Sequence, residues 1–286
     1  MSKKIDIKKK NSFFLLLIMI AGTMLFYSLF QIINWKKDND QIQKEMEQIK
    51  KETIIKEVSS EEAENTTSRQ EDSTTLEDDS ENKKTTFDPY WDFMKYNYLE
   101  VDFSNLAKMN SEVVAWLSVN GTNINYPVVQ HKDNEYYLNH TFNGSKNNAG
   151  WVFLDYRNQI NTWEKNTIIY AHGRQNGSMF GSLKNILKES WYQQKENHII
   201  RLSTPNQNSL WQVFSVYRIP TTNDYIQTSF SSNTSFQTFL EKMKNRSIYD
   251  FQVELNQEDT VLTLSTCYDD NDKVVLHAKY IKRQER

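Results

Sequence analysis

Residues 260–281 read TVLTLSTCYDDNDKVVLHAKYI, and both the fold and the chemistry of this chain depend on this stretch. Polar and apolar residues alternate up to Thr266, and a second β-rich run covers 274–281, a pattern that predicts two strands. Five residues separate Cys267 from Lys273, which is short enough for a hairpin connection. If the two strands pair, Lys273 begins the strand beside Cys267.

The same short-strand pattern recurs upstream, with turn residues between the segments. The expected strands cover 115–119, 126–130, 151–155, 167–170, 198–202, 210–217, 260–266 and 274–281. The expected helices cover 90–98, 103–116, 179–187 and 235–245. Eight strands with inserted helices predict a mainly β fold with helical decoration, namely a β-barrel preceded by helices and carrying an inserted helix near Ser235.

An apolar segment lies near the N-terminus. Residues 13–33 (FFLLLIMIAGTMLFYSLFQII) carry no formal charge and are long enough to cross a bilayer as a helix. The lysines that precede this segment predict a cytoplasmic N-terminus and an external remainder. A cleaved signal peptide is the alternative. The length of the run, and the Asn-Trp-Lys-Lys that follows it in place of small residues, favour an uncleaved anchor.

Charge and composition divide the rest of the chain. Residues 38–85 hold fifteen acidic and seven basic side chains and few apolar ones, which predicts a stalk and spacer. We therefore expect a basic tail at 1–12, an anchor at 13–33, a linker at 34–86 and an external folded domain at 87–286. The whole chain has a net charge of −3, which disfavours binding to nucleic acid.

Cys267 is the one cysteine of the sequence, so an intrachain disulfide framework and a multi-cysteine zinc site are excluded. It ends a predicted strand, where a rigid scaffold can present a nucleophile. A buried, inert thiol is the alternative interpretation. A nucleophilic thiol needs a base or a cation close by, because only the thiolate attacks.

Five histidines are candidates for that base. His172 follows the apolar strand NTIIYA and precedes a glycine, so its position at a strand exit matches that of Cys267. His277 lies in the middle of a strand, and His131, His140 and His198 have no comparable setting. Of these side chains, His172 is the preferred partner.

Three motifs together resemble those of the sortases, the cysteine transpeptidases that attach proteins to Gram-positive cell walls. They are TLSTC at 263–267, YAHG at 170–173 and NGSMFGSL at 176–183. The segments WLSVNGTNINYPVVQ (116–130), YYLNHTFNGSKNNAGWVFLDYRN (136–158) and SFQTFLEKMKNRSIYD (235–250) are similar to class B sortases. The resemblance covers nearly all of 87–281 and implies an eight-stranded sortase barrel.

The resemblance also implies roles for individual residues. Cys267 takes the position of the nucleophile, His172 that of the acid and base, and Lys273 stands where the family has a catalytic arginine. The substrate groove of the family maps onto Asn134, Leu138, Thr221, Tyr225, Ile226 and Ser265. Each of these groove residues also has a purely structural interpretation, such as core packing for Leu138 and Ile226.

The implied reaction is a two-stage acyl transfer without a metal or cofactor. Cys267 cleaves a C-terminal sorting signal of a surface protein and forms a thioester, which an amine of a peptidoglycan precursor or pilin resolves. One alternative is a sortase-like binding or assembly protein that has lost activity, which Lys273 favours. A hydrolytic cysteine protease, in which water replaces the amine, is another.

Overall fold

The structure is a computed structural model of the whole chain, and it describes residues 2–58, 96–160, 162, 164–267 and 271–285. The chain divides into two compact units, residues 1–45 and 46–286. The helix expected over 90–98 falls largely outside the described residues. Its last position, Tyr98, begins a strand instead.

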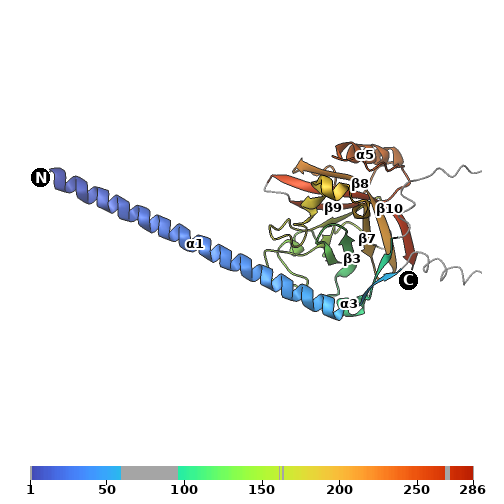
Figure 1. Cartoon of the computed structure of the whole chain (residues 1–286), viewed down its shortest axis with the longest axis horizontal. Coiled ribbons are helices and arrows are strands. Elements are labelled where there is room, and N and C mark those ends of the chain that lie inside the picture. Colours follow the sequence, from blue (N-terminus) through green and yellow to red (C-terminus); the bar gives the residue numbers. More distant parts are fainter. Residues whose placement is uncertain (1, 59–95, 161, 163, 268–270, 286) are drawn as a thin grey trace, which may run out of the picture. The chain divides into compact units, whose positions relative to one another are not determined.

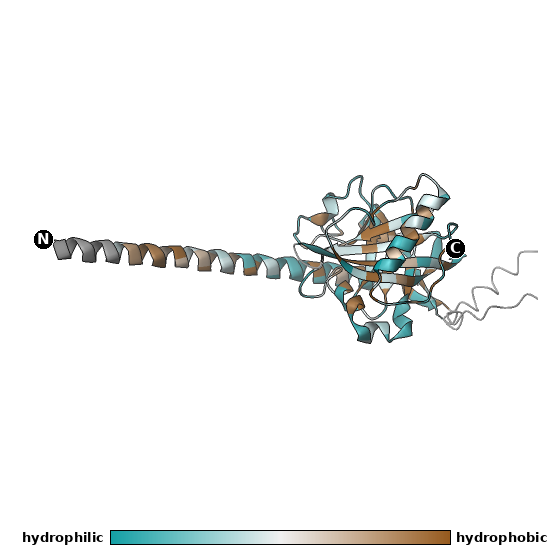
Figure 2. Ribbon diagram, turned by 90° about the horizontal axis from the view of Figure 1, so that it is seen from above, coloured by the Kyte–Doolittle hydropathy of each residue, from teal (hydrophilic) through white to brown (hydrophobic). Residues whose placement is uncertain are grey.

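One continuous helix, α1 (Ser2–Glu52), forms the N-terminal part of the chain (Figure 1). The apolar segment 13–33 lies within it, and its large side chains are exposed. Figure 2 shows this apolar stretch giving way to hydrophilic residues toward the C-terminal end of the helix. In the described part of the chain, this helix is the one long and apolar enough to cross a membrane.

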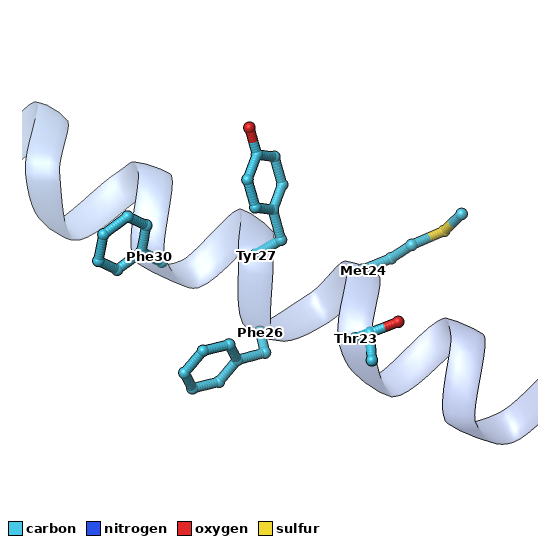
Figure 3. Close-up of a pocket in the computed structure, with 5 residues that line it drawn as sticks. All are labelled: Thr23, Met24, Phe26, Tyr27 and Phe30. Carbon is cyan, nitrogen blue, oxygen red and sulfur yellow. The ribbon is translucent and has the colours of Figure 1, made fainter.

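A hollow on α1 is lined by five side chains of this helix, namely Thr23, Met24, Phe26, Tyr27 and Phe30. In Figure 3 these side chains point to different sides of the helix, with Tyr27 and Phe26 on opposite sides. The hollow is therefore a gap between side chains of a single apolar helix. It holds no nucleophile paired with a base and is no candidate for the active site.

Strands of the second unit close into a barrel, in the order β10-β8-β7-β3-β4-β5-β6-β9 (Figure 1). Their bounds are β3 (Val113–Val119), β4 (Asn125–Val129), β5 (Phe153–Leu154), β6 (Asn166–Tyr170), β7 (Ile199–Ser203), β8 (Gln207–Pro220), β9 (Val261–Cys267) and β10 (Asp272–Glu285). Each of the eight expected strands matches one of these. The barrel predicted from the sequence is confirmed.

Alternation along β9 separates the inside of the barrel from its outer face. Thr263 and Ser265 share one face of β9. The Thr263 hydroxyl donates to Asn166, and the Ser265 hydroxyl meets the hydroxyl of the loop residue Tyr225 at 2.9 Å. The residues between them, Leu262 and Leu264, are fully buried and face inward. Cys267 is the last residue of β9, two positions after Ser265.

The inserted helix α5 (Asn233–Arg246) lies across the outer face of β8 (Figure 1). Its N-terminus is closed by a capping box, in which Ser232 and Ser235 each accept from the other's backbone N–H. Phe236, Phe239, Leu240 and Met243 form its buried stripe. This helix confirms the one expected over 235–245.

Two expected helices are shorter than predicted. The segment expected to be helical over 103–116 forms α3 (Phe103–Met109), and β3 then begins at Val113. Asn110 ends the helix because its side chain accepts from the backbone N–H of Glu112 and so competes with helical bonding. The segment 179–187 contains only the 3-10 turn η3 (Leu183–Leu187). The remaining short helical turns are η2 (Tyr136–Leu138), α4 (Glu189–Tyr192) and η4 (Lys195–His198).

A small two-stranded sheet lies beside the barrel strands in the second unit. It pairs β1 (Ile55–Val58) with β2 (Tyr98–Val101), and Arg201 of β7 binds Glu57 of β1 at 2.7 Å. β1 falls in the segment 34–86, which was expected to be a linker. The structure instead includes residues 46–58 in the compact unit, because β1 has a strand partner there.

Candidate active site

Three neighbouring strands, β6, β9 and β10, bring the candidate catalytic residues to one edge of the barrel. β6 and β9 run parallel, with Tyr170 opposite Ser265. Two positions further along each chain are His172, which follows the end of β6, and Cys267, the last residue of β9. The antiparallel pair β9–β10 places Lys273 directly opposite Cys267.

A hydrogen bond from a side chain to the backbone joins the two segments beyond the last ladder pair of β6 and β9. The Thr266 hydroxyl donates to the carbonyl of Ala171 at 2.7 Å, one residue before the two candidates. Cys267 and Lys273 are ladder partners, and His172 follows β6 by two residues; these three positions are called the row below. Paired residues on adjacent strands have Cβ atoms about 5 Å apart. The register places the backbones of Cys267 and Lys273 side by side.

A hydrogen bond determines which nitrogen of His172 carries the proton in the neutral imidazole. Nε2 lies 2.7 Å from the carbonyl oxygen of Leu138, and a carbonyl can only accept. Nε2 is therefore the protonated nitrogen, and Nδ1 is left to accept a proton. This tautomer leaves a basic nitrogen on an imidazole whose orientation is held by the backbone of η2.

The loop that follows His172 is closed tightly. The His172 carbonyl accepts from the backbone N–H of Arg174 at 3.2 Å and from that of Phe180 at 3.0 Å. Gly181 is required here, because a Cβ at this position would lie 1.9 Å from the carbonyl oxygen of Arg174.

The expected groove residues come from two loops and one strand. Asn134 and Leu138 belong to the loop around η2, and Leu138 is 39% exposed. Thr221 follows β8, and its backbone N–H and hydroxyl both donate to the carbonyl of Asn271, each at 2.9 Å. This contact ties the β8–α5 loop to the start of β10, beside Lys273.

Tyr225 and Ser265 have a more structural position than the groove role suggests. Their hydroxyls bond each other, and both residues are buried, with 3% and 4% exposed. Ile226 on the same loop is half-buried. Of the other expected groove residues, Leu138 and Thr221 are exposed, and Asn134, like Ile226, is half-buried.

The arginines near the C-terminus do not join the row. Arg218 binds Asp272 through Nε, and its position on β8 is separated from β9 by β10. Arg283 lies at the far end of β10, opposite Ser209, and pairs with Glu285 at 2.7 Å. Among the described cations, Lys273 is the one in register with Cys267.

A polar cluster that was not expected from the sequence is centred on Asp155, directly after β5. Asp155 is fully buried, and the Tyr170 hydroxyl and the Arg157 guanidinium bind its carboxylate. Burial raises the pKa of Asp155, but hydrogen bonds from Arg157, Asn134 and Tyr170 outweigh burial and hold that pKa below its usual value. The sequence signal was the polar DYRN directly after the apolar strand WVFL.

The family of the chain follows from its similarity to known proteins. The profile of the sortase domain family matches residues 117–281, which include His172, Cys267 and Lys273. The chain belongs to the sortase family.

Several similar sortases are of class B. Sortase B of Listeria monocytogenes is 35% identical over 186 residues, which cover 64% of this chain and 75% of that protein. Sortase B of Staphylococcus aureus is 35% identical over 189 residues, which cover 65% and 77%. A structure of the Staphylococcus aureus sortase B–substrate complex superposes with a TM-score of 0.59 at 36% identity, covering 63% of this chain and 84% of that one. These similarities support class B and, with it, a cysteine transpeptidase.

Proposed function

We propose that this sortase is a membrane-anchored transpeptidase in which Cys267 is the nucleophile, His172 the general acid and base, and Lys273 the cationic partner. The observation that supports the proposal is the register of β9 and β10, which pairs Cys267 with Lys273, together with the parallel pairing of β6 and β9 up to Tyr170 and Ser265, two residues before His172 and Cys267. The substrates are surface proteins with a C-terminal sorting signal. The acceptor is an amine of a peptidoglycan precursor or a pilin.

The first half of the reaction makes a thioester. The thiolate sulfur of Cys267 attacks a backbone carbonyl carbon of the sorting signal, and the carbonyl oxygen becomes an oxyanion. When the carbon–nitrogen bond breaks, protonated His172 gives its Nδ1 proton to the leaving amine. Lys273 and a backbone N–H supply the positive potential that stabilises the oxyanion.

The second half transfers the acyl group. An incoming amine attacks the thioester carbon and loses a proton to Nδ1 of His172. The carbon–sulfur bond then breaks and returns the thiolate. If water takes the place of the amine, the same residues hydrolyse the signal, so the acceptor alone separates a transpeptidase from a hydrolytic protease.

The test uses the full chain in detergent with a library of sorting peptides, with and without an amine acceptor, and analyses products by mass spectrometry. We expect ligated product only when the amine is present. Cys267→Ala and His172→Ala should abolish both cleavage and ligation while keeping the wild-type melting temperature. Free acid as the sole product would indicate a protease, and an inactive wild type would indicate a degenerate binding scaffold.

We also propose that α1 anchors the protein with its N-terminus in the cytoplasm and residues 46–286 outside. Five lysines precede the apolar segment, and basic residues are retained on the cytoplasmic side of a span. Protease treatment of intact cells should release fragments of the barrel while leaving a cytoplasmic control protein whole. Protection of the barrel until the cells are lysed would contradict this topology.

A further inference from the structure

Asp155 accepts hydrogen bonds at both carboxylate oxygens although it is fully buried. Oδ1 accepts from the backbone N–H of Arg157 at 2.9 Å and from its Nε at 2.8 Å. Oδ2 accepts from Arg157 Nη2 at 2.7 Å, from the Tyr170 hydroxyl at 2.9 Å and from Asn134 Nδ2 at 3.0 Å. A buried charge is tolerated when it is bonded in this way, and removing a partner is costly.

One branch of this cluster leads to the imidazole of His172. Asn134 donates to Asp155 and accepts from the backbone N–H of Tyr156 at 3.0 Å, which fixes the loop that enters η2. The last residue of η2, Leu138, supplies the carbonyl that accepts from His172 Nε2. The carboxylate therefore acts on His172 through the loop and not by direct contact.

A second branch leads to the strand that carries His172. Tyr170, the last residue of β6, lies two residues before His172, and its hydroxyl donates to Asp155. Burial and the adjacent carboxylate raise the pKa of Tyr170 far above its usual value, so the hydroxyl remains a donor. Both sides of the imidazole, its strand and its acceptor, are thus attached to the same carboxylate.

A third branch leads to the loop after β8 that carries Ile226, one of the expected groove residues. Arg157 Nη2 donates to the carbonyl of Ile226 at 3.0 Å while the same guanidinium holds Asp155. The planar fork of an arginine makes these contacts together, which an ammonium does not. The loop that carries Ile226 is held to the cluster by this contact.

We propose that Asp155 and Arg157 are positioning residues of the active site: Asp155 holds His172 in its Nε2–H tautomer through Asn134 and Leu138, and Arg157 holds the Ile226 wall of the substrate groove. The proposal rests on the proposed function and deepens it. It assigns separate effects to the two residues. Asp155 governs the proton-transfer step, and Arg157 governs the binding of the peptide.

The kinetic test compares Asp155→Asn and Arg157→Lys in the full chain with a sorting peptide and an amine acceptor. Asp155→Asn should lower kcat by about 10²-fold, because a catalytic group displaced by about 1 Å loses that much. Arg157→Lys should raise KM by about tenfold, the equivalent of one hydrogen bond from a charged donor, with kcat changed less than about threefold. Arg201→Lys is the matched control, since Arg201 pairs with Glu57 away from the row. It should change neither constant.

A second readout does not depend on turnover. In chain labelled with ¹⁵N only at histidine, the ring nitrogen shifts report the tautomer, and His172→Ala assigns the signal. Wild type, Arg157→Lys and Arg201→Lys should show the Nε2–H form, whereas Asp155→Asn should show a mixture. If the wild type turns over no peptide but the tautomer still changes in Asp155→Asn, the proposed function fails and the positioning role stands.

The proposal is overturned if Asp155→Asn lowers the melting temperature but leaves both kcat and the tautomer as in wild type. It is equally overturned if Arg157→Lys leaves KM unchanged. If Asp155→Asn does not fold, Asn134→Ala replaces it, because this change cuts the branch to η2 and keeps the pair between Asp155 and Arg157. An unchanged His172 tautomer in Asn134→Ala then refutes the role of Asp155.

Discussion

Lys273 has the charge of an arginine without its geometry. The ladder places it opposite Cys267 on one side and opposite Ile219 of β8 on the other, so its backbone position is held by strands on both sides. An ammonium offers three donors on a flexible stem, whereas a guanidinium offers a planar fork that can bind two acceptors at once. Lys273 can therefore stabilise an oxyanion, but with less directional control.

Lys273→Ala should lower kcat by about 10²-fold, the loss that follows removal of one oxyanion donor. Lys273→Arg should retain or increase activity, because the guanidinium restores a two-pronged donor at the same position. Initial rates of ligation at saturating peptide measure both effects.

Arg283→Ala is the control for charge alone, since Arg283 lies on the same strand at its far end and is 53% exposed. It should leave the rate within about twofold of wild type, because an exposed charge away from the site has little effect. Wild-type turnover in Lys273→Ala would mean that Lys273 is a strand-end charge without a role in stabilising the oxyanion. Activity that appears only in Lys273→Arg would support the degenerate scaffold.

At the scale of secondary-structure elements, a buried histidine lies at the interface between α5 and the barrel. His277 on β10 is fully buried, and its ring lies 6.3 Å from that of Phe239 on α5. Thr263 donates its hydroxyl to Asn166, so it accepts from His277 Nδ1, while the Tyr217 hydroxyl donates to Nε2. This histidine is a neutral structural residue, which agrees with the secondary role that its mid-strand position predicts.

Burial, reinforced by Arg246 and opposed by Asp224, lowers the pKa of His277 to about 3. A lowered pKa means that the unfolded chain takes up the proton first, so stability is lost as the pH falls below about 6.5. The free energy of unfolding should decrease by about 2 kcal/mol between pH 7 and pH 5 through this group. Guanidinium unfolding of wild type and His277→Leu at both pH values measures this contribution as a difference.

His277→Leu retains the other titrating groups, so its unfolding free energy should change by about 2 kcal/mol less than that of wild type over this range. Activity at pH 7 should remain close to wild type. An identical pH dependence in the two proteins would contradict the buried neutral state. A loss of turnover comparable to that of His172→Ala would show that the wrong histidine was assigned to catalysis.

The elements that the sequence predicted are those with a strong local pattern. The eight barrel strands and the apolar stripe of α5 follow from periodicities of two and of three to four residues, which depend on nearby residues alone. β1 carries the charged sequence IKEV and is a strand because β2 supplies a partner more than forty residues away. The Asp155 cluster was missed for the same reason, since Asn134, Tyr170 and Ile226 approach it from three separate segments.

At the scale of the whole molecule, the start of the folded unit is the feature that the sequence placed too late. The acidic composition of 38–85 favours a linker, yet Ile49 is fully buried and the β1–β2 sheet lies within the second unit. The backbone N–H of Asp102 donates to the carbonyl of Ile54, and Asn105 donates to that of Glu52, both at 2.9 Å. Residues 46–58 are therefore part of the domain and not a spacer in front of it.

Two fragments test this boundary. A fragment that begins at Met46 retains these contacts and should melt at the temperature at which the barrel melts in the full chain. A fragment that begins at Phe87 loses the strand partner of β2 and the buried side chain of Ile49.

Loss of one large buried side chain costs about 3 kcal/mol, and each kcal/mol shifts the melting temperature of a domain of this size by about 3 °C. The shorter fragment should thus melt about 10 °C lower than the longer one, as followed by tryptophan fluorescence. Glu57→Gln in the longer fragment is the control. It should lower the melting temperature by no more than about 3 °C, because an exposed ion pair contributes at most about 1 kcal/mol. Equal melting temperatures for the two fragments would mean that residues 46–58 belong to the linker and not to the domain.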